Sequence, residues 1–145
     1  MTRRHCIAGI FAIFLLPGCA EVTERRKLRA ADAAALRWLA MVDAGAYSAA
    51  WHDAAPAFKA RSAVEEWTKT AASRPPGAVS ERRRASQQYL TTFGGNQGEF
   101  VNLAYTVSAA GGSSFGELIT VMMAPDGQWR VYGYRVVGAK QGPAV

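Results

Sequence analysis

The first half of the chain carries apolar residues at a helical spacing, and the second half carries them at the spacing of strands. In residues 28–46 they recur in steps of three and four, at Leu28, Ala31, Ala35, Leu39, Val42 and Ala46. These steps predict a long helix with one buried face. Gly45 predicts the end of this helix, because glycine readily takes the left-handed conformation that closes a helix.

Two shorter helices are expected next. Apolar residues continue at helical spacing over residues 47–58, and Pro56 should end or bend that segment. The run Ser62-Ala63-Val64-Glu65 has the pattern of a capping box, in which the serine and the glutamate each satisfy a free N–H at the start of a helix. Arg74, just before two prolines, is expected to donate to the last carbonyls of this third helix.

The second half predicts four consecutive strands, over residues 79–91, 101–107, 115–123 and 129–137, with a possible bulge at Gly133. Glycine-rich or Pro-Asp-Gly turns separate the last three. Helices followed by antiparallel strands indicate an α+β fold, with two to three N-terminal helices packed on one face of a four-stranded antiparallel sheet. We expect the domain to span residues 28–138, a hollow to lie between helix and sheet, and residues 139–145 to form a flexible tail.

Residues 1–18 have the features of a signal peptide, with basic residues at positions 3 and 4 and an apolar run over 6–16. The run is too short to cross a bilayer, which takes about 20 residues. It ends in Leu16-Pro17-Gly18-Cys19-Ala20, which resembles a bacterial lipobox. We therefore predict cleavage before Cys19 and acylation of Cys19, followed by a tether over residues 19–27.

Two alternatives to the lipid anchor stay open, namely ordinary cleavage after Ala20 and an uncleaved N-terminal anchor. Ala20 after the cysteine resembles the pattern of outer-membrane sorting in Gram-negative bacteria, so the expected location is the periplasmic side of the outer membrane. Without the anchor, the protein would be soluble in the periplasm or secreted. Basic residues at 25, 26, 27 and 29 either contact anionic headgroups or form a solvated helix start.

Charge and cysteine content exclude several function classes. Loss of the leader leaves 15 basic and 11 acidic residues, a net charge of +4, which is too weak a basic footprint for a nucleic-acid binder. Cys6 and Cys19 both lie in the first nineteen residues, so no disulfide is expected in the domain. His52 is the single histidine after the leader. We therefore predict no metal site and no cofactor.

A set of aromatic, acidic and glycine-containing segments is spread over residues 30–137. In chain order they are Trp38-Leu39, Asp43-Ala44-Gly45-Ala46-Tyr47, Trp51, Phe58, Trp67, Arg74, Gly77, Glu117-Leu118-Ile119-Thr120 and Asp126-Gly127-Gln128-Trp129-Arg130-Val131-Tyr132-Gly133-Tyr134. In this order and spacing, the chain resembles the domain-of-unknown-function 4019 family of small bacterial exported proteins. The resemblance implies a cystatin-like or nuclear-transport-factor-like roll, and it implies no activity.

Four polar residues within mostly apolar elements are candidate ligand-binding residues: Arg83, Tyr105, Glu117 and Tyr134. Glu117 shares its strand phase with apolar neighbours, and a buried carboxylate needs a partner. If Arg83 points into the hollow, it either meets an anionic ligand or forms an internal ion pair with Glu117. The tryptophans at 38, 51, 67 and 129 have core spacing, with a pocket lining as the alternative.

Three functions remain in view. The first is a periplasm-facing lipoprotein that acts as a non-catalytic binding module of the cell envelope, held to the membrane by its lipid and with an envelope protein as its possible partner. The second is a small-ligand binder that uses the hollow between helix and sheet. The third is an enzyme with Glu117 and a tyrosine as acid and base. The fold alone settles none of these, and the sequence does not set the oligomeric state.

The intact mass of the protein from native membranes tests the lipid anchor. We expect a mass that fits cleavage before Cys19 plus acyl chains, because several acyl chains hold a protein stably at a membrane. The Cys19→Ser variant should lack the added mass, since no thiol remains to be acylated. A bare chain that begins after Ala20 would contradict the anchor.

Overall fold

The computed structural model describes residues 19–140, with side chains described for residues 20–138. The predicted signal peptide over 1–18, the side chain of Cys19 and residues 141–145 of the predicted tail lie outside that description. Residues 139 and 140 belong to the last strand, so the strand is longer than the sequence pattern predicted.

Four helices precede four strands in the described part of the chain. They are α1 (Cys19–Asp43), α2 (Tyr47–Asp53), α3 (Pro56–Arg61), α4 (Val64–Ala72), β1 (Val79–Phe93), β2 (Asn96–Ala109), β3 (Ser114–Met123) and β4 (Trp129–Lys140). The strands form one antiparallel sheet in the order β1-β2-β3-β4. The predicted α+β class, with N-terminal helices on a four-stranded antiparallel sheet, is confirmed.

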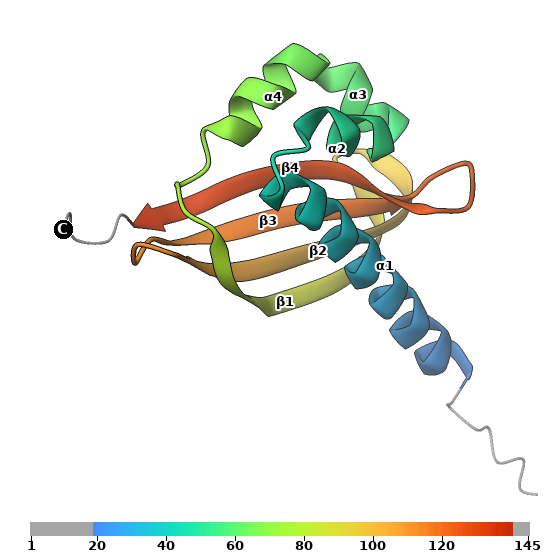
Figure 1. The fold of residues 1–145 in the computed structure, drawn as a ribbon. Helices are drawn as coiled ribbons and strands as arrows, with labels where there is room; N and C mark the ends of the chain where they lie inside the picture. The colour runs from blue at the N-terminus through green and yellow to red at the C-terminus, as the bar shows by residue number, and fades with distance from the viewer. Residues whose placement is uncertain (1–18, 141–145) are drawn as a thin grey trace, which may run out of the picture.

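The long helix α1 begins earlier than its apolar stripe. Residues 19–27, predicted as a tether, are the first turns of α1, and Figure 1 shows them extending away from the body of the protein as a stem. Side chains from Glu21 to Arg26 are exposed. The buried stripe starts at Ala31 and includes Trp38 and Leu39. This half of α1 packs across one face of the sheet (Figure 1).

The segment between α1 and the sheet differs from its prediction at two points. Pro56 does end a helix, but it also begins the next one, because proline fits the first turn where its missing N–H is not needed. The expected capping box is wrong. The residue that precedes α4 is Ala63, with no side-chain cap, and the Ser62 hydroxyl lies 3.4 Å from the Ala63 carbonyl instead.

Tryptophan side chains join the helices to one another. The indole N–H of Trp38 donates to the Ala50 carbonyl, and that of Trp67 donates to the Tyr47 carbonyl, each at 2.8 Å. The rings of Trp38, Trp67 and Phe58 stack at centroid distances of 5.2–6.2 Å. These tryptophans are therefore core residues, with their polar atoms satisfied by neighbouring backbone.

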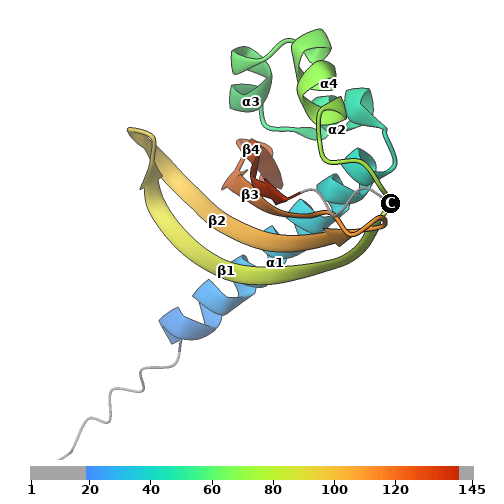
Figure 2. The same ribbon diagram turned by 90° about the vertical axis from the view of Figure 1, so that its left-hand side faces the viewer.

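The sheet is strongly curved, as Figure 2 shows. Strand β1 has three register shifts against β2, and such irregularities bend a strand and increase its twist. The β1–β2 hairpin turns through Gly94 and Gly95, both with positive φ, as a tight two-residue turn requires. As a result Phe93, at the tip of β1, lies 5.8 Å from the ring of Tyr132 on the opposite edge strand.

Replacing Trp67 tests the assignment of the aromatic core. We expect Trp67→Ala to lower the free energy of unfolding by about 3–5 kcal/mol, because it removes a buried ring and leaves a cavity. Ser62→Ala is the control and should change it by less than about 0.5 kcal/mol, since the serine caps no helix. Urea denaturation measures both. Equal effects of the two substitutions would contradict this description.

Candidate functional site

Glu117 on β3 is fully buried on the sheet face that α1 covers. Its carboxylate accepts three hydrogen bonds: from Arg74 at 2.7 Å, from Arg82 at 2.8 Å and from the Tyr134 hydroxyl at 2.8 Å. Charge-assisted bonds of this kind offset the cost of removing a carboxylate from water. Of the alternatives that the sequence left open for Glu117, the internal ion pair is the one present.

Asp43, at the end of α1, closes the group into a ring. It accepts hydrogen bonds from Arg82 at 2.9 and 3.0 Å and from Arg74 at 3.0 Å. The two arginines and two carboxylates sum to zero charge. Burial alone would lower the pKa of Arg82, but its bonds to Asp43 and Glu117 outweigh burial and raise it. Both arginines therefore serve as internal counterions.

Tyr105 and Tyr134 also face α1, and both hydroxyls are engaged. Burial and the Glu117 charge raise the pKa of Tyr134. Burial and a 2.6 Å bond to Asp32 raise the pKa of Tyr105. Asp32 also pairs with Arg84 at 2.7 Å. These tyrosines stay protonated and act as donors inside the fold.

Arg83 does not point into the space between helix and sheet, so the condition on which its candidate role depended is not met. Its backbone pairs with Thr106, whereas Arg82 pairs with the buried Val107, so Arg83 points to the sheet face away from α1. Its side chain is 73% exposed and lies 3.4 Å from Glu81. Arg83 therefore forms no ion pair with Glu117, which was one of the alternatives left open. The Arg74 side chain bonds Asp43 and Glu117, and it is the backbone N–H of Arg74 that donates to a helix-end carbonyl, that of Ala71 at 3.3 Å.

The expected hollow between helix and sheet is occupied by side chains. Trp38, Leu39 and Val42 from α1 meet Ile119 and Glu117 from the sheet, all at 1% exposure or less. For the second function considered, ligand binding in that hollow, there remains a smaller cavity of about 220 Å³ at the end of α1, lined in part by Asp43, Arg74 and Phe115.

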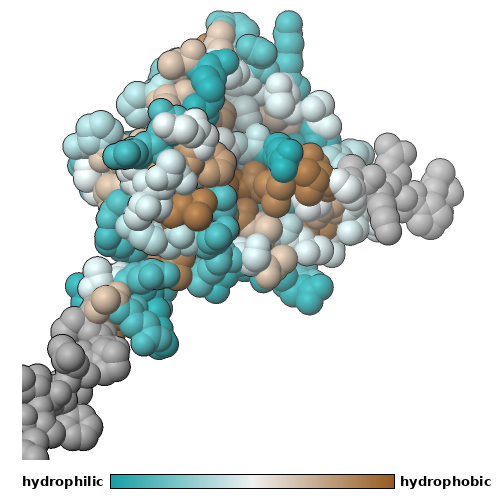
Figure 3. All heavy atoms as spheres, turned by 180° about the vertical axis from the view of Figure 1, so that it is seen from behind, coloured by the Kyte–Doolittle hydropathy of each residue, from teal (hydrophilic) through white to brown (hydrophobic). Residues whose placement is uncertain are grey.

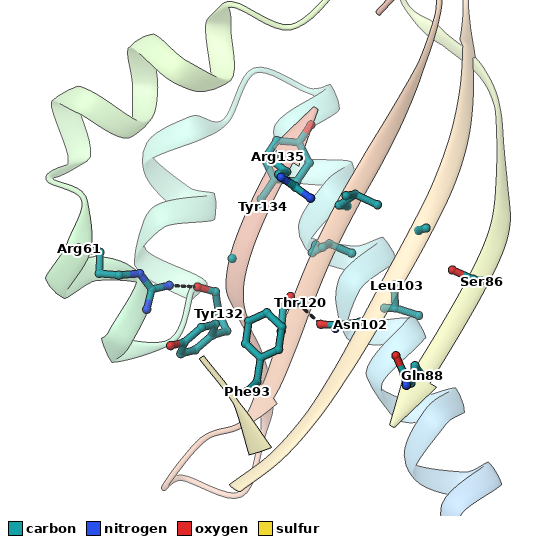
Figure 4. Close-up of a pocket in the computed structure, with 14 residues that line it drawn as sticks. Arg61, Ser86, Gln88, Phe93, Asn102, Leu103, Thr120, Tyr132, Tyr134 and Arg135 are labelled. Atoms are coloured by element: carbon teal, nitrogen blue, oxygen red, sulfur yellow. Dashed lines mark hydrogen bonds between the residues drawn. The ribbon is translucent and has the colours of Figure 1, made fainter. Parts of the chain in front are cut away.

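A groove of about 530 Å³ lies instead on the opposite face of the sheet. Figure 3, seen from behind, shows apolar atoms gathered around this hollow. Its floor includes Ala104, Leu118 and Gly133, and Phe93 and Tyr132 form one end. In Figure 4 the side chains of Gln88, Asn102, Thr120 and Arg135, one from each strand, lie around the space, with α1 behind the sheet. The groove exists because the β1–β2 hairpin curls toward β4.

Polar side chains in the groove are mostly uncharged. Thr120 donates to the Asn102 side-chain oxygen at 2.8 Å across the floor. Ser86 and Gln88 project from β1. Among the described residues that line the groove, the charged ones are arginines, at 61 and 135, and there is no aspartate, glutamate or lysine. The groove is therefore apolar in its floor and positive in its charge.

The two arginines differ in how they are held. The Arg61 guanidinium lies 4.2 Å from the centre of the Tyr132 ring and donates to the Tyr132 carbonyl, so it braces one wall. Within residues 19–140, the Arg135 side chain has no hydrogen-bond or ion-pair partner. Among the residues that the structure describes, Arg135 thus has no counterion, and it lies at the edge of an apolar groove.

The described residues contain no group of three or more histidine, cysteine, aspartate or glutamate side chains placed to hold a metal ion. Nor does any helix within residues 19–140 combine the length and apolar character needed to cross a bilayer.

Sequence reasoning singled out Glu117, Tyr105 and Tyr134 as candidate ligand-binding residues, and the structure shows them bonded to one another or to other side chains inside the fold. It missed Arg135 and the groove. Both the odd-numbered and the even-numbered residues of β1 are mostly polar, so the alternation of side chains did not show which of Arg82 and Arg83 points toward α1. Alternation along β3 was the available signal for the groove, because Leu118 and Thr120 must face away from the buried Glu117 and Ile119.

Comparison with known proteins gives one match. The model of a family described as "Protein of unknown function (DUF4019)" matches residues 34–134, which include the buried charge network and most of the groove. No curated protein and no solved structure matches the chain.

The pH dependence of stability tests the charge network. Burial alone would raise the pKa of Asp43, but hydrogen bonds from Arg82 and Arg74 outweigh burial and lower it below 3.8. Above pH 3.8 a carboxyl with a lowered pKa stabilises the folded state, because it is ionised and paired there. This stabilisation is lost as the pH falls through the pKa that the group has in the folded state. We therefore expect the free energy of unfolding to fall between about pH 5 and pH 2.

Asp43→Asn should make that fall shallower, as followed by urea denaturation at each pH, because the amide cannot titrate. Glu65→Gln, at an exposed position on α4, is the matched control and should leave the slope unchanged. Identical slopes for wild type and Asp43→Asn would show that the network contributes nothing to the pH dependence.

Proposed function

The chain belongs to the DUF4019 family, and on that premise we propose that it is a lipid-anchored protein on the periplasmic side of the outer membrane. In this proposal it binds another component of the cell envelope in the groove on the open face of its sheet, and it catalyses no reaction. The groove, with an unpartnered Arg135 at its edge, is the observation that carries the proposal.

The course of α1 supports the anchor. A helix rises about 1.5 Å per residue, so residues 19–27 form a stem of about 13 Å between the proposed lipid on Cys19 and the body. The stem is continuous with the half of α1 that packs on the sheet (Figure 1). An anchored protein of this form would hold its sheet at a fixed height above the membrane.

The arrangement of Glu117 supports a role without catalysis. An acid–base residue must reach the proton that it transfers, whereas Glu117 is at 0% exposure and both of its oxygens accept internal bonds. The two tyrosines considered as its partners, Tyr105 and Tyr134, are themselves donors to buried or half-buried carboxylates. These groups stabilise the fold and do not face the groove with a free hydroxyl or carboxylate.

Two classes of envelope component suit the open face, a protein and a small molecule. A protein partner is favoured by composition, because arginine and aromatic residues are enriched in interface cores while lysine and acids are depleted. A small ligand is favoured by size, because about 530 Å³ falls within the usual range of ligand sites.

Crosslinking in intact cells tests the groove as the binding surface. Gln87 and Gln88 are neighbours on β1 and both are exposed, but they point to opposite faces, and only Gln88 lines the groove. We expect a photoreactive amino acid at position 88 of the full chain to form an adduct and the same amino acid at position 87 to form none.

The size of the adduct distinguishes a protein from a small molecule. No adduct at position 88, or the same adduct from both positions, would contradict the proposed function.

A further inference from the structure

We propose that the groove binds a single-chain amphiphile, a molecule with an apolar body and one anionic head, and that Arg135 binds the head. This inference rests on the proposed function in one respect, namely that the groove is the binding surface. It adds the chemistry of the ligand.

The charge of the head is inferred from the charges that line the groove. Arg74, Arg82, Arg84 and Arg130 each lie within 3.1 Å of a carboxylate. Arg135 has no such partner among the described residues, and no acid is among the described residues that line the groove. A guanidinium binds carboxylate or phosphate oxygens through paired N–H donors. An anion is therefore the complement that the described lining of the groove lacks.

The apolar body follows from the floor. Ala104 and Leu118 pair across β2 and β3, and Arg135 lies opposite Leu118 on β4. Gly133 lies on the same floor, and a Cβ atom added there would meet nothing within 4 Å. A side chain at position 133 would thus occupy space that the fold leaves free. An apolar group laid along this floor would be removed from water.

The length of the body is set by the two ends of the groove. Arg135 lies three residues along β4 from Tyr132, which is about 10 Å at a rise of about 3.3 Å per residue. Figure 4 shows Arg135 at one end and Phe93 with Tyr132 at the other. An alkyl chain with its head at Arg135 would reach the aromatic end, and a chain as long as that of dodecanoate would extend past it.

A single anionic group fits better than a polyanion. Arg61, the second arginine, is already held by the ring and carbonyl of Tyr132. The Asn102 and Thr120 side chains, near the middle of the floor, bond to each other. One guanidinium, that of Arg135, is left to bind an anion, and the remaining lining supplies apolar contact and uncharged polar groups.

Isothermal titration calorimetry with dodecanoate, kept below its critical micelle concentration, tests the proposal on the full chain carrying Cys19→Ser. We expect saturable binding at one site. Dodecylammonium, with the same chain and the opposite charge, should bind at least roughly tenfold more weakly, because Arg135 would repel it. Acetate, which has the head without the body, should show no saturable binding.

Two variants test whether dodecanoate binds in the groove. Gly133→Leu should weaken dodecanoate binding at least roughly tenfold by filling the floor, and Ala104→Leu serves the same purpose if the first variant does not fold. Arg135→Gln should weaken binding by about tenfold and remove the preference for dodecanoate over dodecylammonium. Arg37→Gln, an exposed arginine on α1, is the control and should leave binding unchanged.

Three results would overturn the inference: no saturable dodecanoate binding, equal binding of dodecylammonium, or full binding by a folded Gly133→Leu variant. If dodecanoate does not bind but position 88 still forms its specific adduct in cells, the ligand chemistry is wrong and the proposed binding surface stands. If both experiments fail, the proposed function falls as well.

Discussion

A buried carboxylate sets the constraint on which the rest of this structure depends. Glu117 lies in the middle of the sheet at 0% exposure, where an unpaired charge would cost several kcal/mol. Arg74, Arg82 and Tyr134 supply the bonds that make its burial tolerable. Those three residues come from the segment after α4, from β1 and from β4, and Asp43 adds the end of α1. One charge therefore fixes how five parts of the chain meet.

This network also decides which face of the sheet remains open. Because Arg82 must reach Glu117, β1 turns Arg82 and Arg84 toward α1 and leaves Arg83 and Gln88 on the other face. The inner face is then closed by apolar packing and paired charges. The outer face keeps its apolar residues, and the curl of the β1–β2 hairpin toward Tyr132 shapes them into a groove. Curvature and face assignment together create the candidate site.

The chemistry of the two faces points to different roles. On the inner face, hydrogen bonds satisfy both oxygens of Glu117, and the same two arginines bond Asp43 at the end of α1. On the outer face, Arg135 lacks a partner among the described residues, and Gly133 leaves room above the floor. The buried carboxylate of Glu117 cannot reach a substrate proton, whereas the guanidinium of Arg135 lies exposed beside an apolar surface. This arrangement suits the binding of an anionic amphiphile better than acid–base catalysis.

The sequence by itself determined the order and type of most elements, because helical and two-residue spacings follow directly from local geometry. It also indicated that Glu117 would be buried and in need of a partner. Only the tertiary structure decided that Arg82 and Arg74 are those partners, that α1 begins at Cys19, and that the groove of about 530 Å³ lies on the sheet face opposite the helices. Strand pairing, register shifts and sheet curvature set these features, and they depend on contacts between residues far apart in the chain.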